Sequence, residues 1–254
     1  AIAEENDPLG RMPGEVLWPQ RYPAERLKEI ARTLGSYLYS ALYSQRPQPP
    51  GGAKFKRADF RYFREEGEHY LLLMKGGTRR VAKTDCWRFQ TIDPAASERE
   101  SADWFVVMTL DVTPCNRILV VDVRRERAET TQHDRIMAES KGNWRPSYQA
   151  VESKSFGLNI FQRMRNKGYA ITELKADTDK GSRSLPAQAM MEAERIFFKE
   201  GAHWLMGDNN DGLEPELIAF NKGKHDDQVD CLSYAAIEID AKALDPEPRI
   251  WYAE

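Results

Sequence analysis

The sequence has few of the features that mark secreted, membrane-spanning or thiolate-metal proteins. Its 254 residues include only three cysteines, Cys86, Cys115 and Cys231, which are far apart and form no C-x-x-C pair. This odd, scattered set argues against a disulfide framework and against a zinc site. No apolar run approaches the length that crosses a bilayer, and the first residues lack a secretion-signal pattern. We therefore expect a reducing, cytoplasmic setting without membrane contact.

A global positive charge is also absent, since 37 Lys and Arg stand against 40 Asp and Glu, giving a formal net charge of −3. The total can conceal opposite local patches, so it does not exclude an anionic partner. Apolar residues make up 41% and charged residues 30%, which is typical of a globular chain. No internal repeat or low-complexity tract is present, so solenoids and propellers are not expected.

The chain divides at a proline- and glycine-rich segment, QRPQPPGG, at residues 45–52. Before it, a Pro/Gly-rich connector leads to a helical stripe of apolar residues within residues 24–44. Because the segment can continue neither a helix nor a central strand, we place a boundary there. Residues 1–52 are interpreted as a linker and helix, and residues 53–254 as the main domain.

The main domain predicts a mixed α/β fold. A hairpin is expected at 60–63 and 69–75, followed by an antiparallel meander at 87–92, 104–110 and 117–123. Helices are then expected at 129–140, 155–166, 186–200 and 226–241, with strands at 147–151, 169–174 and, more weakly, 203–206. Strand–helix alternation indicates parallel pairing, so antiparallel strands should be followed by parallel ones in one sheet flanked by helices.

Acidic residues occur where strands and the last helix meet loops. Asp93 directly follows the strand WRFQTI, and Glu152 directly follows SYQAV. If those strands are parallel neighbours, their ends lie about 4.8 Å apart, at the edge where open α/β sheets bind ligands. The segment HDDQVD supplies Asp226, Asp227 and Asp230 at the start of the last helix. Taken singly, these residues could equally be turn residues or helix caps.

Together the acids predict a metal site. Carboxylates that converge without basic partners would repel one another unless cations intervene. Mg²⁺ or Mn²⁺ prefers such oxygen ligands, and two ions about 3.5–4 Å apart can promote phosphodiester hydrolysis. We therefore expect Asp93, Glu152 and Asp227 to be catalytic metal ligands, with Asp226 and Asp230 as further ligands. Which of the three acids in HDDQVD bind metal directly stays open.

The order of these motifs resembles the nuclease half of the large terminase subunits of tailed bacteriophages. The segments DPLGRMPGEVLWP, ALYSQRPQPPGG and AFNKGKHDDQVDCLSYA resemble the same family. The resemblance implies a ribonuclease H-like fold and a divalent-metal endonuclease that cuts concatemeric double-stranded phage DNA during genome packaging. It further implies an upstream ATPase domain, the portal or procapsid and the small terminase subunit as partners, in the cytoplasm of an infected bacterium.

One departure from the family is that the sequence has no G-x-x-x-x-G-K-[ST] phosphate-binding loop. ATP hydrolysis is therefore not expected of this chain, and the connector-like first residues favour a C-terminal fragment. Two rivals remain open. One is a Holliday-junction resolvase or transposase-like nuclease on the same fold, and the other is a non-catalytic DNA-gripping or docking module.

A local basic excess surrounds Glu152, where residues 141–183 hold nine basic and four acidic side chains. Such a patch would hold DNA phosphates beside the acids, and we expect Lys154, Lys180 and Arg183 to contribute most. For Arg163, Arg165 and Lys167, a solvated helix face is as good an interpretation. No segment resembles a helix that reads the major groove, so binding should tolerate any sequence.

Overall fold

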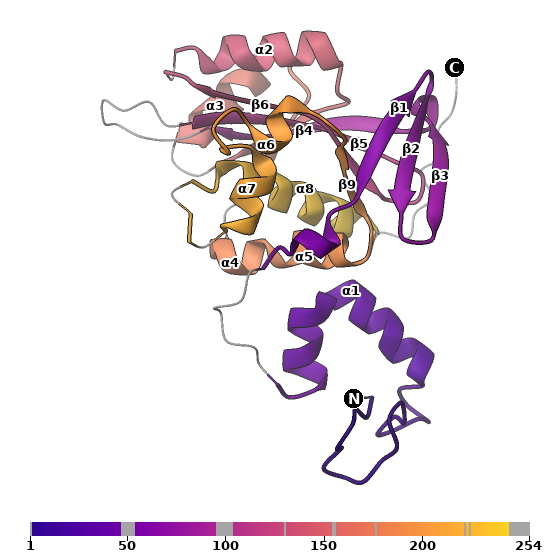
Figure 1. Ribbon diagram of the computed structural model, residues 1–254. Coiled ribbons are helices and arrows are strands. Elements are labelled where there is room, and N and C mark those ends of the chain that lie inside the picture. The colour runs from indigo at the N-terminus through magenta and orange to yellow at the C-terminus, as the bar shows by residue number, and fades with distance from the viewer. Residues whose placement is uncertain are drawn as a thin grey trace.

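A nine-stranded mixed sheet forms the centre of the computed structural model, with strand order β3-β2-β1-β9-β6-β5-β4-β7-β8 (Figure 1). The structure describes residues 2–46, 54–94, 104–129, 131–153, 156–175, 177–220, 222–223 and 225–243. The strands are β1 (Tyr62–Glu66), β2 (His69–Met74), β3 (Gly77–Ala82), β4 (Trp87–Pro94), β5 (Trp104–Val112), β6 (Ile118–Arg127), β7 (Gln149–Glu152), β8 (Ile171–Leu174) and β9 (Ile196–Lys199).

Helices cover both faces of this sheet. They are α1 (Ala24–Tyr43), α2 (His133–Trp144), α3 (Phe156–Asn166), α4 (Lys180–Arg183), α5 (Leu185–Glu192), α6 (His203–Met206), α7 (Leu213–Ile218) and α8 (Asp227–Ala243). Short 3₁₀ turns lie at Arg57–Asp59 and Lys83–Asp85. Helices α2 and α3 lie on one face, and α5, α7 and α8 on the other (Figure 1). The expected α/β architecture is therefore confirmed.

The predicted meander is confirmed, because β4, β5 and β6 are antiparallel neighbours in sequence order. The predicted hairpin is also present as β1 and β2, and a third antiparallel strand, β3, extends it. The later strands pair in parallel as expected, β7 with both β4 and β8. The change from antiparallel to parallel pairing follows the change from short loops to helical crossovers.

Two secondary-structure expectations were wrong. The long helix expected at 186–200 ends at Glu192, and Glu194 adopts a left-handed φ of 54°, which breaks the helix. Residues 196–199 then form β9, whose bulky residues are buried between β1 and β6. The strand expected at 203–206 is the helix α6, and α7 was not predicted at all.

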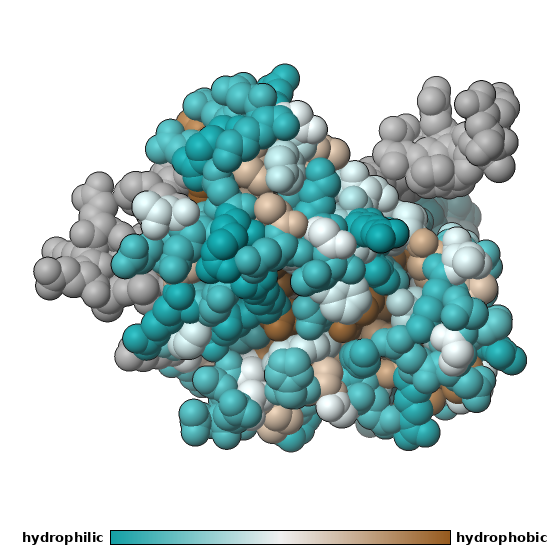
Figure 2. All heavy atoms as spheres, turned by 90° about the horizontal axis from the view of Figure 1, so that it is seen from above, coloured by the Kyte–Doolittle hydropathy of each residue, from teal (hydrophilic) through white to brown (hydrophobic). Residues whose placement is uncertain are grey.

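The largest apolar cluster lies between the sheet and α5 and α8. Leu232, Ala235 and Ala236 of α8 are fully buried in this cluster, to which Met108 and Val120 of the sheet also belong. Small alanines let the helix backbone approach the strands closely, which fixes where α8 begins. On the α2 side the outer surface is mainly hydrophilic, with apolar residues visible only between polar ones (Figure 2). None of the described helices is both long and apolar enough to span a bilayer.

The N-terminal helix α1 packs against α5 of the main domain. At Gly35 the backbone leaves helical geometry, with φ 73° and ψ 169°. The next residue, Ser36, donates from its backbone N and from Oγ to the Glu192 carboxylate, both at 2.7 Å. The proline-rich boundary near residue 52 lies outside the described residues, so the division at that point stays a prediction.

Replacing Gly35 should loosen this contact. An added Cβ would lie 2.9 Å from Cβ of Ala189, on a backbone with a φ that side chains rarely adopt. We expect Gly35→Ala to lower the free energy of unfolding by about 2 kcal/mol in urea titrations. The control is Gly142→Ala in α2, where an added Cβ meets nothing within 4 Å. That variant should be neutral or stabilising by about 0.5 kcal/mol, and equal losses in both would contradict this account.

An ion cluster joins α2 to α3. The Asp134 carboxylate accepts from Arg163 Nη2 at 2.6 Å and from Lys167 Nζ at 2.8 Å. The hydrogen bond from Arg163 is the main cause that lowers the pKa of Asp134 to about 2. Two of the basic residues considered as DNA contacts thus hold the two helices together.

Stability should therefore depend on the charge of Asp134. Because its folded pKa is depressed, the contribution is present above its unfolded pKa and is lost as pH falls from about 4 towards 2. We expect Asp134→Asn to lower stability by about 1 kcal/mol at pH 7, after allowing for solvent screening, and by much less at pH 2.5. Glu68→Gln, at an exposed hairpin turn, is the control. A pH-independent loss would assign the effect to packing instead.

Candidate active site

Asp93 and Glu152 lie at the same edge of the sheet. Strands β4 and β7 are parallel, and their last recorded pair is Ile92 with Val151. Asp93 and Glu152 are the next residue on each strand, and both are included in the strands rather than following them. Asp93 pairs with Val106 of β5, so the backbone of Asp93 is held by that neighbouring strand. The sheet thus places these two acids as neighbours, as the sequence predicts.

The start of α8 brings further acids to this edge. Glu216 of α7 accepts from the backbone N of Gln228 at 2.7 Å and of Val229 at 3.2 Å, and so caps the first turn of α8. Asp227 and Asp230 lie in that turn. The cap comes from a different helix, so the sequence carried no local signal for it.

Electrostatics show that the acids act on one another. Burial raises the pKa of Asp93 well above its ordinary value, and the negative charges of Glu152, Asp230 and Asp227 raise it further, in that order. Burial also raises the pKa of Asp227, against the opposing charge of Arg125. The surroundings of Asp93 and Asp227 therefore disfavour the ionised form of these two side chains.

Basic side chains compensate part of this charge, contrary to the expectation of a cluster without basic partners. Lys180 Nζ lies 2.6 Å from Asp226 Oδ1 and 3.1 Å from Asp230 Oδ2, and Arg183 Nη2 lies 2.7 Å from Asp230 Oδ1. Burial would lower the pKa of Lys180, but its contacts with both acids raise it above the ordinary value. Two residues expected to bind DNA are therefore paired with acids, and the third, Lys154, lies outside the described residues.

The chemical type of the side chains at this edge suits a divalent cation. Carboxylate oxygens are the ligands that hard cations take, and a buried acid with a raised pKa gains most from a cation. As the side chains lie, no three His, Cys, Asp or Glu side chains in the described part of the chain form a group that could hold a metal ion. Oxygens of Asp226 and Asp230 contact Lys180 instead.

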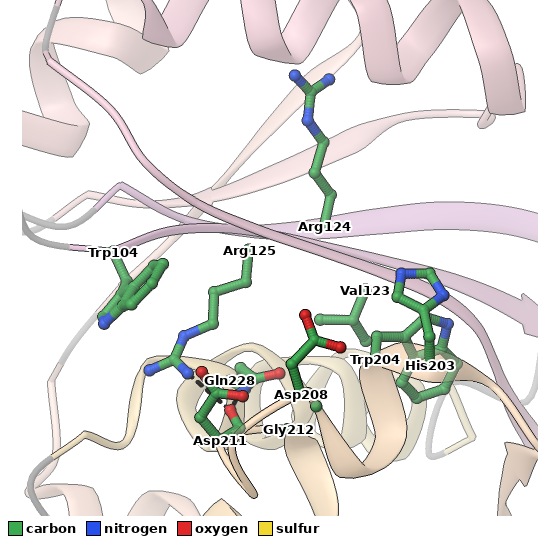
Figure 3. Close-up of a pocket in the computed structure, with 11 residues that line it drawn as sticks. Trp104, Val123, Arg124, Arg125, His203, Trp204, Asp208, Asp211, Gly212 and Gln228 are labelled. Carbon is green, nitrogen blue, oxygen red and sulfur yellow. Dashed lines mark hydrogen bonds between the residues drawn. The ribbon is translucent and has the colours of Figure 1, made fainter.

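A cavity of about 310 Å³ lies beside β6, lined also by residues of α6, of the segment between α6 and α7, and by Gln228 of α8 (Figure 3). Arg125 of β6 points into this cavity, and its Cζ lies 4.3 Å from the centre of the Trp104 ring. Its Nη1 donates a hydrogen bond to the backbone carbonyl oxygen of Asp211 at 2.7 Å. Its Nη2 lies 3.9 Å from Asp227, so Arg125 connects the cavity to the acidic cluster. Arg124 points to the opposite side of the sheet (Figure 3). The sequence analysis missed Arg125, although strand alternation through RRER could have placed it on the α8 face.

The mixed sheet, with acids ending two parallel neighbours and a final helix adding more, defines a ribonuclease H-like fold of the terminase nuclease class. The chain belongs to the terminase RNaseH-like domain family, whose sequence model matches residues 90–238. This confirms the family resemblance. Strands β1–β3 precede the matched residues, as does α1. No curated protein matches the sequence.

Solved structures are similar to this chain at low sequence identity. The large terminase from a thermophilic bacteriophage, solved in complex with ADP, is 10% identical, with a TM-score of 0.55, over 83% of this chain and 50% of that one. The large terminase nuclease from the thermophilic phage G20c is 16% identical, with a TM-score of 0.48, over 73% of this chain and 98% of that one. That nuclease has also been solved with bound magnesium.

Removing the Asp93 charge should stabilise the metal-free protein. Asp93→Asn keeps the shape of the side chain but cannot ionise, so it avoids the cost of burying a carboxylate beside Glu152, Asp230 and Asp227. We expect its melting temperature in EDTA to rise by a few degrees, because functional sites retain such unfavourable charges at the expense of stability. The exposed control Asp85→Asn should not change it. An unchanged or lower melting temperature for Asp93→Asn would show that the neighbouring acids do not destabilise the protein through Asp93.

Proposed function

We propose that this chain is a divalent-metal-dependent endonuclease that cuts concatemeric double-stranded phage DNA during genome packaging, with little sequence preference. The observation that carries the proposal is the meeting of Asp93 with Glu152, Asp227 and Asp230 at one edge of a terminase-type sheet. Acids from two strands and a helix gathered at one point serve no packing purpose, but they suit cations that act on phosphodiesters.

In this proposal Asp93, Glu152 and Asp227 hold two cations, Mg²⁺ or Mn²⁺. When bound, the cations would supply the positive charge that stabilises the attacking and leaving oxygens of hydrolysis. The chain itself positions the ligands, because Asp93 and Glu152 are held by sheet hydrogen bonds and Asp227 by the capped start of α8. Asp226 is an additional ligand, and Asp230 is a candidate whose paired partner Arg183 competes for its oxygens.

The setting of this activity is proposed to be a packaging motor. This chain matches half of the longer phage large terminase that was solved in complex with ADP. By analogy, residues 1–52 would connect the nuclease to an upstream ATPase domain of the same polypeptide, and residues 53–254 would form the nuclease domain. The portal or procapsid, the small terminase subunit and double-stranded DNA would be the partners, in the cytoplasm of the infected bacterium.

Removing any of the three acids should abolish cutting. We expect Asp93→Asn, Glu152→Gln and Asp227→Asn each to lower the rate of plasmid cleavage in Mn²⁺ at least about 100-fold, because each loses part of a charge stabilisation of several kcal/mol. Cleavage rates on gels, with and without EDTA, measure this. Asp85→Asn, an exposed acid on the 3₁₀ turn Lys83–Asp85, should cut like the unmodified protein.

Two outcomes would contradict the proposal. Unchanged nicking by the three variants would remove these acids from the mechanism, and metal-independent cleavage would remove the cations. A comparison of linear duplex with a four-way junction tests the junction-resolvase alternative. Preference for the junction by more than about tenfold, or 1.4 kcal/mol, would favour that activity instead.

A further inference from the structure

Lys180 lies between two carboxylates at the start of α8. Its Nζ is 2.6 Å from Asp226 Oδ1 and 3.1 Å from Asp230 Oδ2, so one ammonium group bridges both acids. The residue begins α4, where the Asp179 side chain accepts from the backbone N of Ser182 and holds the first turn. The backbone under Lys180 is therefore fixed, while its long side chain reaches into the acidic cluster.

The exposure of Lys180 differs from that of its neighbour Arg183. The Arg183 side chain is 4% exposed and pairs with Asp230, which is 3% exposed, while its guanidinium lies 4.8 Å from the centre of the Tyr234 ring. A buried pair of this kind is costly to break, so Arg183 stays in place. The Lys180 side chain is 50% exposed and Asp226 is 35% exposed. An exposed pair is weak and is easily exchanged for another partner.

We propose that Lys180 is a built-in counter-ion, which stands in the place of a divalent cation between Asp226 and Asp230 and moves to a DNA phosphate when the cation binds. The inference rests on the proposed function. The Lys180 ammonium group and a metal cation compete for the same carboxylate oxygens. Asp226 Oδ1 accepts a hydrogen bond from Lys180 Nζ at 2.6 Å, so the lone pair used in that bond is not free to bind a cation. Once displaced, the flexible lysine stem keeps its charge at the edge where a DNA backbone would lie.

The exchange would couple the binding of the cation to the binding of DNA. A cation that frees Lys180 makes it available to DNA, and DNA that takes Lys180 frees the carboxylates for a cation. By linkage each ligand then raises the affinity for the other by the same factor. The protein without DNA would hold its cation weakly, and the nuclease would be assembled only where DNA is present.

The test measures binding rather than cleavage. Isothermal titration with Mn²⁺ alone compares the unmodified chain with Lys180→Gln, Lys180→Arg and the control Lys222→Gln. Lys222 is exposed and pairs with none of the described acids. We expect Lys180→Gln to bind Mn²⁺ about fivefold more tightly, the worth of an exposed ion pair. Lys180→Arg and Lys222→Gln should bind within about twofold of the unmodified chain.

A second measurement follows the displaced lysine. Binding of a short DNA duplex in Ca²⁺ is measured by fluorescence anisotropy at several salt concentrations. Lys180→Gln should lower the salt slope of DNA affinity by about one, whereas without cation it should leave the slope unchanged, because Lys180 is then engaged with the acids. Thermal unfolding of each variant shows that it is folded.

The outcomes separate this inference from the proposed function. Equal or weaker Mn²⁺ binding by Lys180→Gln, with the unmodified chain binding Mn²⁺, would overturn the counter-ion role and leave the nuclease proposal standing. A salt slope that changes equally with and without cation would also overturn it. Failure of every folded form to bind Mn²⁺, with or without DNA, would overturn the metal-dependent function and this inference with it.

Discussion

Mutual repulsion among carboxylates at one edge of the sheet is the constraint around which the rest of the structure is arranged. Glu152, Asp230 and Asp227 all raise the cost of ionising Asp93, which is itself shielded from water. Cationic side chains from two other elements, β6 and α4, reach into the cluster and compensate part of this charge. Each of these ion pairs lowers the electrostatic cost of gathering the acids at one place.

The scaffold holds the acids against that repulsion by backbone pairing and close packing. Asp93 pairs with Val106 of β5, and Glu152 pairs with Leu174 of β8. Helix α8 is held in position at two places. Ala235 and Ala236 are fully buried in the core, and Glu216 caps the first turn of the helix. The positions of Asp93, Glu152 and Asp227 are therefore set by strands and a helix packed on the core and not by loops, which suits the rigidity that the proposed site needs.

Local patterns predicted the parts of this arrangement that depend on neighbours in sequence. Alternation and turn residues predicted β4, β5 and β6, and the edge rule for parallel strands predicted that Asp93 and Glu152 would meet. Long-range pairing was not predictable in the same way. Strand β9 looked like the end of a helix because its identity as a strand depends on β1 and β6, far away in the chain. The pairing of Lys180 with Asp226 likewise needs α4 to lie beside α8.

The compensating cations bear on how such a nuclease could be restrained. An acidic site that only metal could neutralise would bind metal strongly whether or not DNA were present. Here Arg183 offsets part of the charge of Asp230 at all times, and Lys180 offsets more until it is displaced. On the proposed function, the net free energy of cation binding would be reduced by the ion pairs that must be exchanged. On the proposed assignment, a DNA phosphate takes Lys180 as a contact and so removes its competition with the cation. The affinity for the cation then rises when DNA is bound, and cleavage depends on the presence of the substrate through this exchange of ion pairs.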